Sequence, residues 1–255
     1  MIKEMKKLLF LMAAILMQTA AMAAGTDSLT VRIKGMRCDE CAHKVMTAIN
    51  KLPGIDNIDF NLERRTATIF YDGSKTCADS IIGRLAATGR YKSSPYSKDD
   101  VIKRGWGIHI DDMHCQKCYN RIQEKLQPMA GIDSMAPHID NQYIFVRYDA
   151  NRTTKAAIRE AILSLGYTPV NHYTSDKVEF TYLLIPEKVA QSEDTYETVI
   201  SLKGVEDACV NANRKALAIT YFNDETSEEQ LMKELKDAGI KAELPPLHVC
   251  DEEKK

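Results

Sequence analysis

The sequence lacks the charge pattern of a nucleic-acid-binding protein. Its 34 Lys and Arg residues are balanced by 36 Asp and Glu residues, which gives a formal net charge of −2. No stretch of the chain combines clustered basic residues with interleaved aromatic residues. Proteins that bind nucleic acid neutralise its phosphates with such a basic surface. We therefore expect no nucleic-acid partner.

Long apolar runs and nucleotide-binding motifs are missing after Ala23. A membrane-spanning helix needs about 20 mostly apolar residues, and no later segment is apolar over that length. The sequence also contains no glycine-rich phosphate loop and no phosphorylation motif. We expect no membrane insertion of the mature chain, and the sequence does not have the parts of an ATP-driven pump.

The first 23 residues have the pattern of a secretory signal peptide. Positive charge at Lys3, Lys6 and Lys7 precedes an apolar core from Leu8 to Met17, and Ala21-Met22-Ala23 supplies small residues at a cleavage site. The alternative interpretation is an uncleaved membrane anchor, but the apolar core is short for a segment that spans a membrane. We predict export after cleavage at Ala23, to the periplasm where the cell has two membranes.

Cysteine is scarce, but four of the seven cysteines form a repeated motif. The segments 35–41 and 112–118 both contain Met-x-Cys-x-x-Cys, and each lies between an alternating strand pattern and a helical pattern. Thiolates at this spacing can close on one soft metal ion. A single Cys-x-x-Cys is weak evidence, whereas two copies in the same context are strong evidence. The candidate metal ligands are Cys38, Cys41, Cys115 and Cys118.

The two motifs belong to a longer internal repeat. An offset of 77 residues, which places Cys38 on Cys115, also aligns several turn and strand residues without a gap, and an offset of 150 reveals a third copy. In that copy Lys188 and Gln191 replace the two cysteines, and Pro186 replaces the methionine. The aligned residues are Gly54 with Gly131 and Gly204, Tyr71 with Tyr148 and Tyr221, and Gly89 with Gly166 and Gly239.

Each repeat has the same order of hydrophobic patterns. In the first, the alternation of Leu29, Val31 and Ile33 predicts a strand, and Val45, Ile49 and Leu52 at helical spacing predict a helix that ends at Gly54. A hairpin turning near residues 61–65 and a second helix ending at Gly89 follow. We predict an α+β protein of three tandem ferredoxin-like βαββαβ units, each an antiparallel sheet with two helices on one face, at residues 28–97, 105–174 and 177–247, followed by a charged tail at 248–255.

The motif segments resemble the heavy-metal-associated domain family, whose signature is a Gly-Met-x-Cys-x-x-Cys loop in a βαββαβ unit. The first copy has all of these residues, and the second has Asp112 in place of the glycine. This family occurs in copper and mercury metallochaperones and in the N-terminal modules of metal-pumping ATPases. The resemblance implies metal carriage or buffering and not catalysis, with a metal-transporting membrane protein or another thiolate carrier as partner. It also implies that Met36 and Met113 pack beneath their loops.

The chemistry of the loops favours Cu(I) as the bound ion. The second cysteine of each pair is expected in the first turn of a helix, where the helix dipole favours the thiolate that binds metal. Two sulfurs suit two-coordinate Cu(I) or Hg(II) better than tetrahedral Zn(II). Asp39, Glu40 or His114 as an extra ligand would favour Zn(II) or Cd(II), as would sharing of one ion by both loops across a flexible linker at 92–104. We expect solvated side chains at all three positions.

Two other classes of function use the same cysteines. A thiol–disulfide oxidoreductase would use the pairs as redox centres, although the motifs lack the flanking tryptophan and internal proline that thioredoxin-like sites show. A structural adaptor would keep both pairs as disulfides, which an oxidising compartment favours.

The remaining three cysteines have weaker signals. Cys77 begins the second predicted helix of the first repeat, and Cys209 lies in a predicted strand of the third repeat, where we expect it to be buried and inert. Cys250, two residues after His248 in the charged tail, either binds metal weakly or belongs to an unstructured end.

Overall fold

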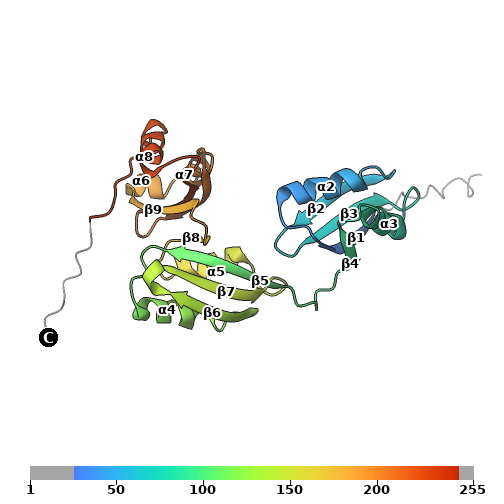
Figure 1. Cartoon of the computed structure of the whole chain (residues 1–255), viewed down its shortest axis with the longest axis horizontal. Helices are drawn as coiled ribbons and strands as arrows, with labels where there is room; N and C mark the ends of the chain where they lie inside the picture. The colour runs from blue at the N-terminus through green and yellow to red at the C-terminus, as the bar shows by residue number, and fades with distance from the viewer. Residues whose placement is uncertain (1–25, 247–255) are drawn as a thin grey trace, which may run out of the picture. The chain divides into compact units, whose positions relative to one another are not determined.

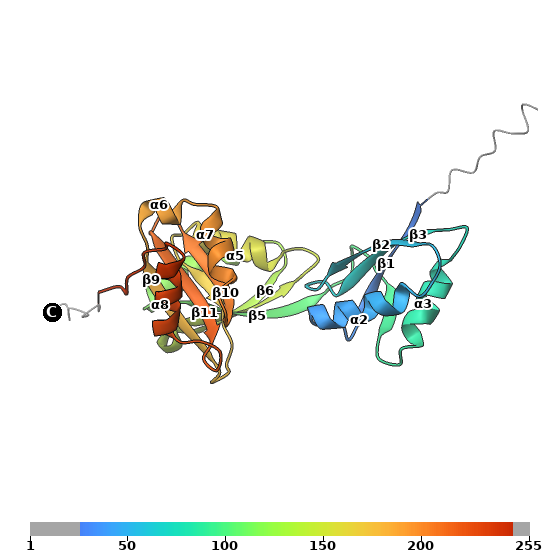
Figure 2. The same cartoon turned by 90° about the horizontal axis from the view of Figure 1, so that it is seen from above.

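A computed structural model describes residues 26–246 of the chain. The predicted signal peptide and the predicted tail at 248–255 lie outside the described residues. The chain divides into two compact units, Met1–Asp100 and Val101–Lys255. The first unit contains the first repeat, and the second unit contains the second and third repeats (Figures 1 and 2).

The first unit is a βαββαβ fold, as predicted. Its elements are β1 (Thr26–Lys34), α2 (Asp39–Ile49), β2 (Ile55–Asn61), β3 (Thr66–Asp72), α3 (Ala78–Ala86) and β4 (Lys92–Pro95). The four strands are antiparallel and lie in the order β2-β3-β1-β4.

The second repeat has the same topology with one short helix added. Its elements are β5 (Lys103–Ile110), α4 (Gln116–Leu126), β6 (Ile132–His138), the 3-10 helix η1 (Ile139–Asn141), β7 (Tyr143–Asp149), α5 (Lys155–Leu163) and β8 (Pro169–Asn171). The strand order is β6-β7-β5-β8, which matches the first repeat position by position.

The third repeat departs from the prediction at its first helix and its last strand. Its elements are β9 (Val178–Leu184), α6 (Glu187–Ala190), α7 (Asp194–Ile200), β10 (Val205–Asn211), β11 (Ala216–Phe222) and α8 (Glu228–Asp237), with a three-stranded sheet in the order β10-β11-β9. A single bridge between Leu184 and Glu243 stands where the fourth strand was predicted. Pro245 and Pro246 follow it closely and have no N–H to donate, so the pairing does not extend.

The three repeats share their backbone irregularities as well as their elements. The hairpin turn of each contains one non-glycine residue with positive φ, at Arg65, Gln142 and Lys215, which are related by the offsets of 77 and 150. A bulge also occurs at the same place in β2, β6 and β10. The repeat read from the sequence is therefore a structural repeat in detail.

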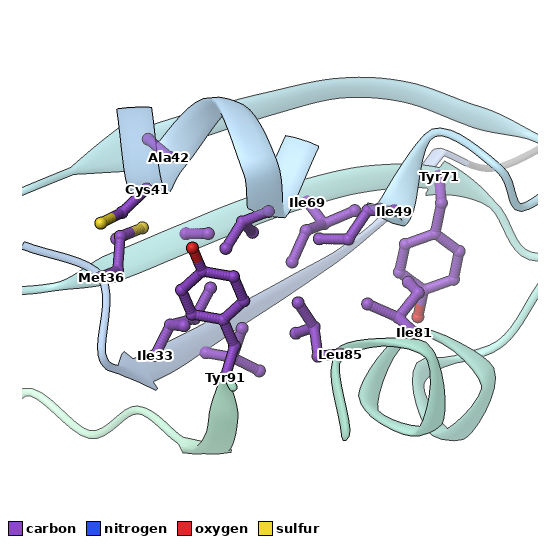
Figure 3. Close-up of a cluster of buried hydrophobic side chains, with 13 residues drawn as sticks. Ile33, Met36, Cys41, Ala42, Ile49, Ile69, Tyr71, Ile81, Leu85 and Tyr91 are labelled. Atoms are coloured by element: carbon purple, nitrogen blue, oxygen red, sulfur yellow. The ribbon is translucent and has the colours of Figure 1, made fainter. Parts of the chain in front are cut away.

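The hydrophobic core of the first unit lies between its sheet and its two helices. Val31 and Ile33 of β1 meet Val45 and Ile49 of α2, and all four are fully buried. Met36 and Cys41 lie at one end of this cluster and Tyr71 at the other (Figure 3). The packing that holds the fold together thus reaches the base of the first cysteine loop.

The linker predicted at 92–104 is shorter in the structure, which corrects that expectation. Lys92–Pro95 form β4 and pair with residues 31–34 of β1, and Lys103 already begins β5. Ile102 is buried, and its N–H donates to the Asp149 carboxylate at 2.9 Å. Residues 92–95 pair with the exposed edge of β1, where backbone N–H and C=O groups would otherwise lack partners. The segment between the two sheets is therefore limited to residues 96–102.

The second and third repeats pack against each other within the second unit. Val170 of β8 meets Cys209 and Ala218 on the sheet of the third repeat. The Asn211 side-chain amide donates to the carbonyls of Gly166 and Tyr167, both at 3.1 Å. The second cysteine loop therefore belongs to a larger packed body than the first. Among residues 26–246, no helix is long and apolar enough to cross a membrane.

Candidate metal centres

The first cysteine pair lies at the N-terminus of α2. Cys38 is the N-cap residue with extended backbone, and Cys41 is in the first helical turn, so their Sγ atoms are 2.9 Å apart. The preceding Gly35 has φ of +98°, and a Cβ there would lie 3.3 Å from the Arg90 carbonyl oxygen. Glycine thus allows the tight path from β1 into the helix. Both cysteines are free thiols, with Cys38 exposed and Cys41 buried.

The environment of Cys41 favours its thiolate. A hydrogen bond from the Cys38 side chain, followed by the Arg37 backbone N–H, lowers the pKa of Cys41 to about 7, from an ordinary value of 9.0. The charge of Arg90 contributes in the same direction. A thiol that deprotonates near neutral pH is ready to bind a soft metal ion.

The second pair repeats this geometry at the N-terminus of α4. Cys115 is the N-cap residue, its Sγ accepts from the Cys118 N–H at 3.4 Å, and the two Sγ atoms are 3.1 Å apart. Burial pushes the pKa of Cys118 upward, but hydrogen bonds from Cys115 and the Tyr167 hydroxyl, together with backbone N–H groups, lower it overall. Both pairs therefore combine close sulfurs with a stabilised thiolate.

Asp112 occupies the place of Gly35 in the second loop and gives that loop a different support. Its Oδ1 accepts from the Thr168 N–H at 3.3 Å, and its Oδ2 lies 3.9 Å from Nη1 of Arg214 in the third repeat. The side chain is 9% exposed, and burial raises the pKa of its carboxyl. The glycine-to-aspartate difference thus ties the second loop to the third repeat.

Comparison with known proteins identifies the domains that carry these loops. The profile of the heavy-metal-associated domain family matches residues 30–90 and residues 108–168. These two segments are heavy-metal-associated domains. Each matched range includes one complete Cys-x-x-Cys loop, and residues 177–246 of the third repeat lie outside both ranges.

The relatives of this chain include copper-transporting ATPases. Copper-transporting ATPase 1 of Rattus norvegicus is 24% identical over 282 residues, covering 87% of this chain and 19% of the ATPase. A copper-exporting P-type ATPase of Bacillus subtilis is 23% identical over 139 residues, covering 54% of this chain and 16% of the ATPase. The crystal structure of oxidized MerP from Ralstonia metallidurans CH34 is 32% identical, with a TM-score of 0.27, and covers 29% of this chain and 100% of that one. This chain spans less than a fifth of the length of either ATPase.

The additional ligands considered from the sequence do not join the cysteines. Within residues 26–246, no group of three or more His, Cys, Asp or Glu side chains is placed to hold a metal ion. Glu40 is 75% exposed and forms an ion pair with Lys44 at 2.5 Å. His114 is exposed, with its Nδ1 3.1 Å from the Gln142 side-chain amide. Among the described side chains, each Cys-x-x-Cys loop offers two thiols.

The methionines of the two loops are buried beneath them, as expected from the family resemblance. Met36 and Met113 are both fully buried, and Met36 is part of the hydrophobic cluster that includes Cys41 (Figure 3). A buried thioether beneath the loop fills space and fixes the loop from below.

Two tyrosines near the cysteines were missed by the sequence analysis. The Tyr167 hydroxyl hydrogen-bonds Cys118. The hydroxyl of the buried Tyr91 points toward Met36 and Cys41 (Figure 3). Burial raises the pKa of Tyr91, and a charged Cys41 raises it further. The available signal was a tyrosine one or two residues after the glycine that ends the second helix of each domain.

The third repeat has no loop of this kind. Pro186 is the N-cap of the four-residue helix α6, which contains Lys188, and Gln191 is its C-cap. The segment that would wrap an ion is thus helical and carries no thiol. Cys209 is 4% exposed, and burial raises its pKa to about 12, which confirms the predicted buried cysteine.

Proposed function

We propose that this protein binds one soft metal ion at each Cys-x-x-Cys loop, with Cu(I) preferred, and passes the ion on by thiolate exchange. The observation that carries the proposal is the pair of free thiols, 2.9 Å apart in one domain and 3.1 Å apart in the other, at the start of a helix. A lowered pKa for Cys41 and Cys118 supports binding at neutral pH. The role is that of a metallochaperone or metal buffer and not of an enzyme.

Cu(I) fits the number and kind of ligands best. Two thiolates without a third side chain nearby suit a two-coordinate soft ion, whereas Zn(II) prefers four ligands in a tetrahedron. The names of the ATPase relatives, which refer to copper, point the same way. Hg(II), Zn(II) and Cd(II) are the competing ions.

Exchange with a partner requires that a sulfur of each pair be reachable. Cys38 and Cys115 are exposed, while Cys41 is buried and Cys118 is partly buried. A thiolate of the partner can therefore bind the ion from the side of the exposed cysteine before the bond between the ion and the less exposed cysteine breaks. The partner is a metal-transporting membrane protein or another thiolate carrier, and the site of action is the periplasm.

The first test measures the metal content of the mature chain. The protein is purified reduced and without oxygen, then exposed to equal amounts of Cu(I), Zn(II), Cd(II) and Hg(II). About two Cu(I) ions per chain are expected, one for each pair of thiolates, and a Cys38→Ser/Cys115→Ser double variant should lose them. Metal-free wild-type protein would overturn the proposal.

Two further measurements separate the competing functions and test the location. A carrier is stabilised by metal according to RT ln(1 + [L]/Kd), whereas a disulfide-locked adaptor is not. An oxidoreductase would reduce insulin with turnover in the presence of a thiol donor, and the carrier would not. Export predicts that the protein recovered from the periplasmic fraction begins after Ala23, so recovery of the full-length chain from the cytoplasm would contradict it.

A further inference from the structure

The segment between α5 and β8 brings a tyrosine to the second cysteine loop. Residues 166–168 lie in this connection, and the Tyr167 hydroxyl hydrogen-bonds Cys118. Tyr167 is 2% exposed, and Cζ of Arg121 lies 5.7 Å from the centroid of its ring. A hydroxyl that donates to a charged sulfur stabilises that sulfur. The position of this segment therefore decides whether Cys118 receives the hydrogen bond.

One buried asparagine of the third repeat binds this segment at three points. The amide nitrogen of Asn211 donates to the carbonyls of Gly166 and Tyr167 and to Oγ1 of Thr168, each at 3.1 Å. Asn211 is 3% exposed, and Thr168 is fully buried. Breaking these bonds would leave buried acceptors unsatisfied, which is costly. The third repeat thus fixes the backbone on both sides of the Tyr167 side chain.

A second residue of the same hairpin contacts the segment and the cysteine loop. The Arg214 N–H donates to Oδ1 of Asn211 at 3.2 Å, so one turn places both side chains. Gly166 has φ of +90°, and a Cβ added there would lie 3.5 Å from Nε of Arg214. Nη1 of Arg214 lies 3.9 Å from Oδ2 of Asp112, three residues before Cys115. The turn between β10 and β11 therefore reaches both ends of the second site.

The first domain has the same turn without this support in its own unit. Asn61, which the offset of 150 places on Asn211, also accepts from a backbone N–H of its turn, that of Arg64 at 2.8 Å. The Asn61 side chain is exposed, and its amide nitrogen donates to no group among the described residues of the first unit. Gly89, the equivalent of Gly166, has no atom within 4 Å of an added Cβ. The asparagine shapes the turn in both repeats, but in the third its amide also binds a neighbouring domain.

We propose that Asn211 is a positioning residue of the second metal site, which holds residues 166–168 so that the Tyr167 hydroxyl donates to the metal-bound sulfur of Cys118. The inference rests on the proposed function, because it concerns the ion that Cys115 and Cys118 bind. The third repeat, which has no thiol loop of its own, then serves as a support for the second domain. The second site holds its ion with a hydrogen bond that depends on the neighbouring repeat.

The test measures the Cu(I) affinity of the second site alone. The parent is the mature chain with Cys38→Ser and Cys41→Ser, and a chromophoric Cu(I) chelator competes for the ion. Tyr167→Phe should weaken binding about tenfold, which is the effect of one hydrogen bond to a charged group. Asn211→Ala leaves that hydroxyl in place but frees its segment, so it should weaken binding at least about threefold.

The double variant shows whether Asn211 acts through Tyr167. If it does, adding Asn211→Ala to Tyr167→Phe should cause no further loss of affinity, because the two residues contribute through one hydrogen bond. A loss in the double variant equal to the product of the two single losses would overturn the inference. So would an Asn211→Ala variant that binds Cu(I) as tightly as the parent.

A matched control separates this role from the contact within the turn. In the chain with Cys115→Ser and Cys118→Ser, Asn61→Ala removes the equivalent acceptor of the Arg64 N–H. The Cu(I) affinity of the first site should not change. A loss at the first site equal to that caused by Asn211→Ala at the second would assign the effect to the turn and would overturn the inference.

Urea unfolding of the metal-free variants shows whether the second unit is folded. If Asn211→Ala is unfolded, Asn211→Ser replaces it, because a serine hydroxyl can accept from the Arg214 N–H but is too short to bind all three acceptors. A parent that binds no Cu(I) at the second loop would overturn the proposed function and the inference with it. A parent that binds Cu(I) no more tightly than the folded Asn211 variant would overturn the inference alone.

Discussion

The reactivity of each cysteine is set by the few groups that touch its sulfur. The pKa of Cys41 falls to about 7 because Cys38 and a backbone N–H hydrogen-bond its thiolate. The pKa of Cys77 is lowered by the Ser80 hydroxyl, 3.2 Å away. Burial raises the pKa of Cys209 to about 12. Within a single chain, cysteine thus ranges from a thiol that ionises near neutral pH to a buried thiol that stays protonated.

Removing one hydroxyl should weaken the thiolate of the second site. Tyr167→Phe deletes the hydrogen bond to Cys118, so the pKa of Cys118 should rise and its alkylation by iodoacetamide at pH 7 should slow. The pH dependence of the alkylation rate, followed by mass spectrometry, measures this shift. Tyr119→Phe is the control, because Tyr119 is buried in the same domain and makes no hydrogen bond to Cys118. Identical profiles for the two variants would contradict the assigned role.

At the scale of the secondary-structure elements, a glycine with positive φ allows the turn between α2 and β2. Gly54 has φ of +75°, and an added Cβ would lie 2.8 Å from Cβ of Lys75. Gly54→Ala should therefore lower the free energy of unfolding of the first unit by about 1–3 kcal/mol. Gly83→Ala, at an exposed position in α3 with no atom within 4 Å, should raise it by about 0.5–1 kcal/mol. Urea unfolding of both variants tests this contrast, which fails if the two changes have the same sign.

Elements with a local pattern were predictable, and those fixed by distant contacts were not. The alternation in β1 and the helical spacing in α2 are properties of neighbouring residues, so the sequence located both, along with the cysteine pairs at the helix starts. The pairing of Lys92–Pro95 with β1 depends on an edge that needs a partner. The contacts of Asp112 with Thr168 and Arg214 depend on which surfaces meet. The hydrophobic periodicity of one segment predicts neither the strand pairing of residues 92–95 nor the contacts of Asp112.

At the scale of the whole molecule, a largely buried ion pair joins the second and third repeats, with the Arg159 side chain 22% exposed and that of Asp207 9% exposed. Asp207 accepts hydrogen bonds from Arg159, at 2.5 and 3.2 Å, and from the Asn171 N–H at 2.8 Å. Asp207→Ala leaves the Arg159 charge without its partner, which should destabilise the second unit by about 3 kcal/mol. Denaturant unfolding of the mature chain measures the loss.

The control for this prediction is an ion pair on the surface of the same unit. Lys177 and Asp224 are 3.0 Å apart, with side chains 69% and 53% exposed. Asp224→Ala should cost less than about 1 kcal/mol, because water screens the pair. Equal losses in the two variants would mean that the Arg159–Asp207 pair contributes no more than a surface contact.

A stack of rings also spans the two repeats and makes their association sensitive to acid. His172 stacks on Tyr143, with ring centroids 3.8 Å apart, and on Phe180 of the third repeat, at 5.3 Å. Burial, and then the charges that His109 and His138 carry when protonated, lower the pKa of His172 to about 4 from an ordinary value of 6.5. The native stack is thus built around a neutral imidazole.

The direction of the pH effect follows from this lowered pKa. Between pH 6.5 and 4 the unfolded chain binds a proton at His172 that the native chain does not, so the unfolding free energy of the second unit should fall as the pH falls through this range. We expect a loss of about 1 kcal/mol, since the ring is only partly buried. His172→Phe keeps a ring in the stack but cannot titrate, so its unfolding free energy should vary less between pH 7 and 5 than that of the wild type. Phenylalanine binds no proton at any pH, so the variant lacks the contribution of His172 to the pH dependence. If the unfolding free energies of wild type and variant changed equally with pH, the acid sensitivity would arise at titratable groups other than His172.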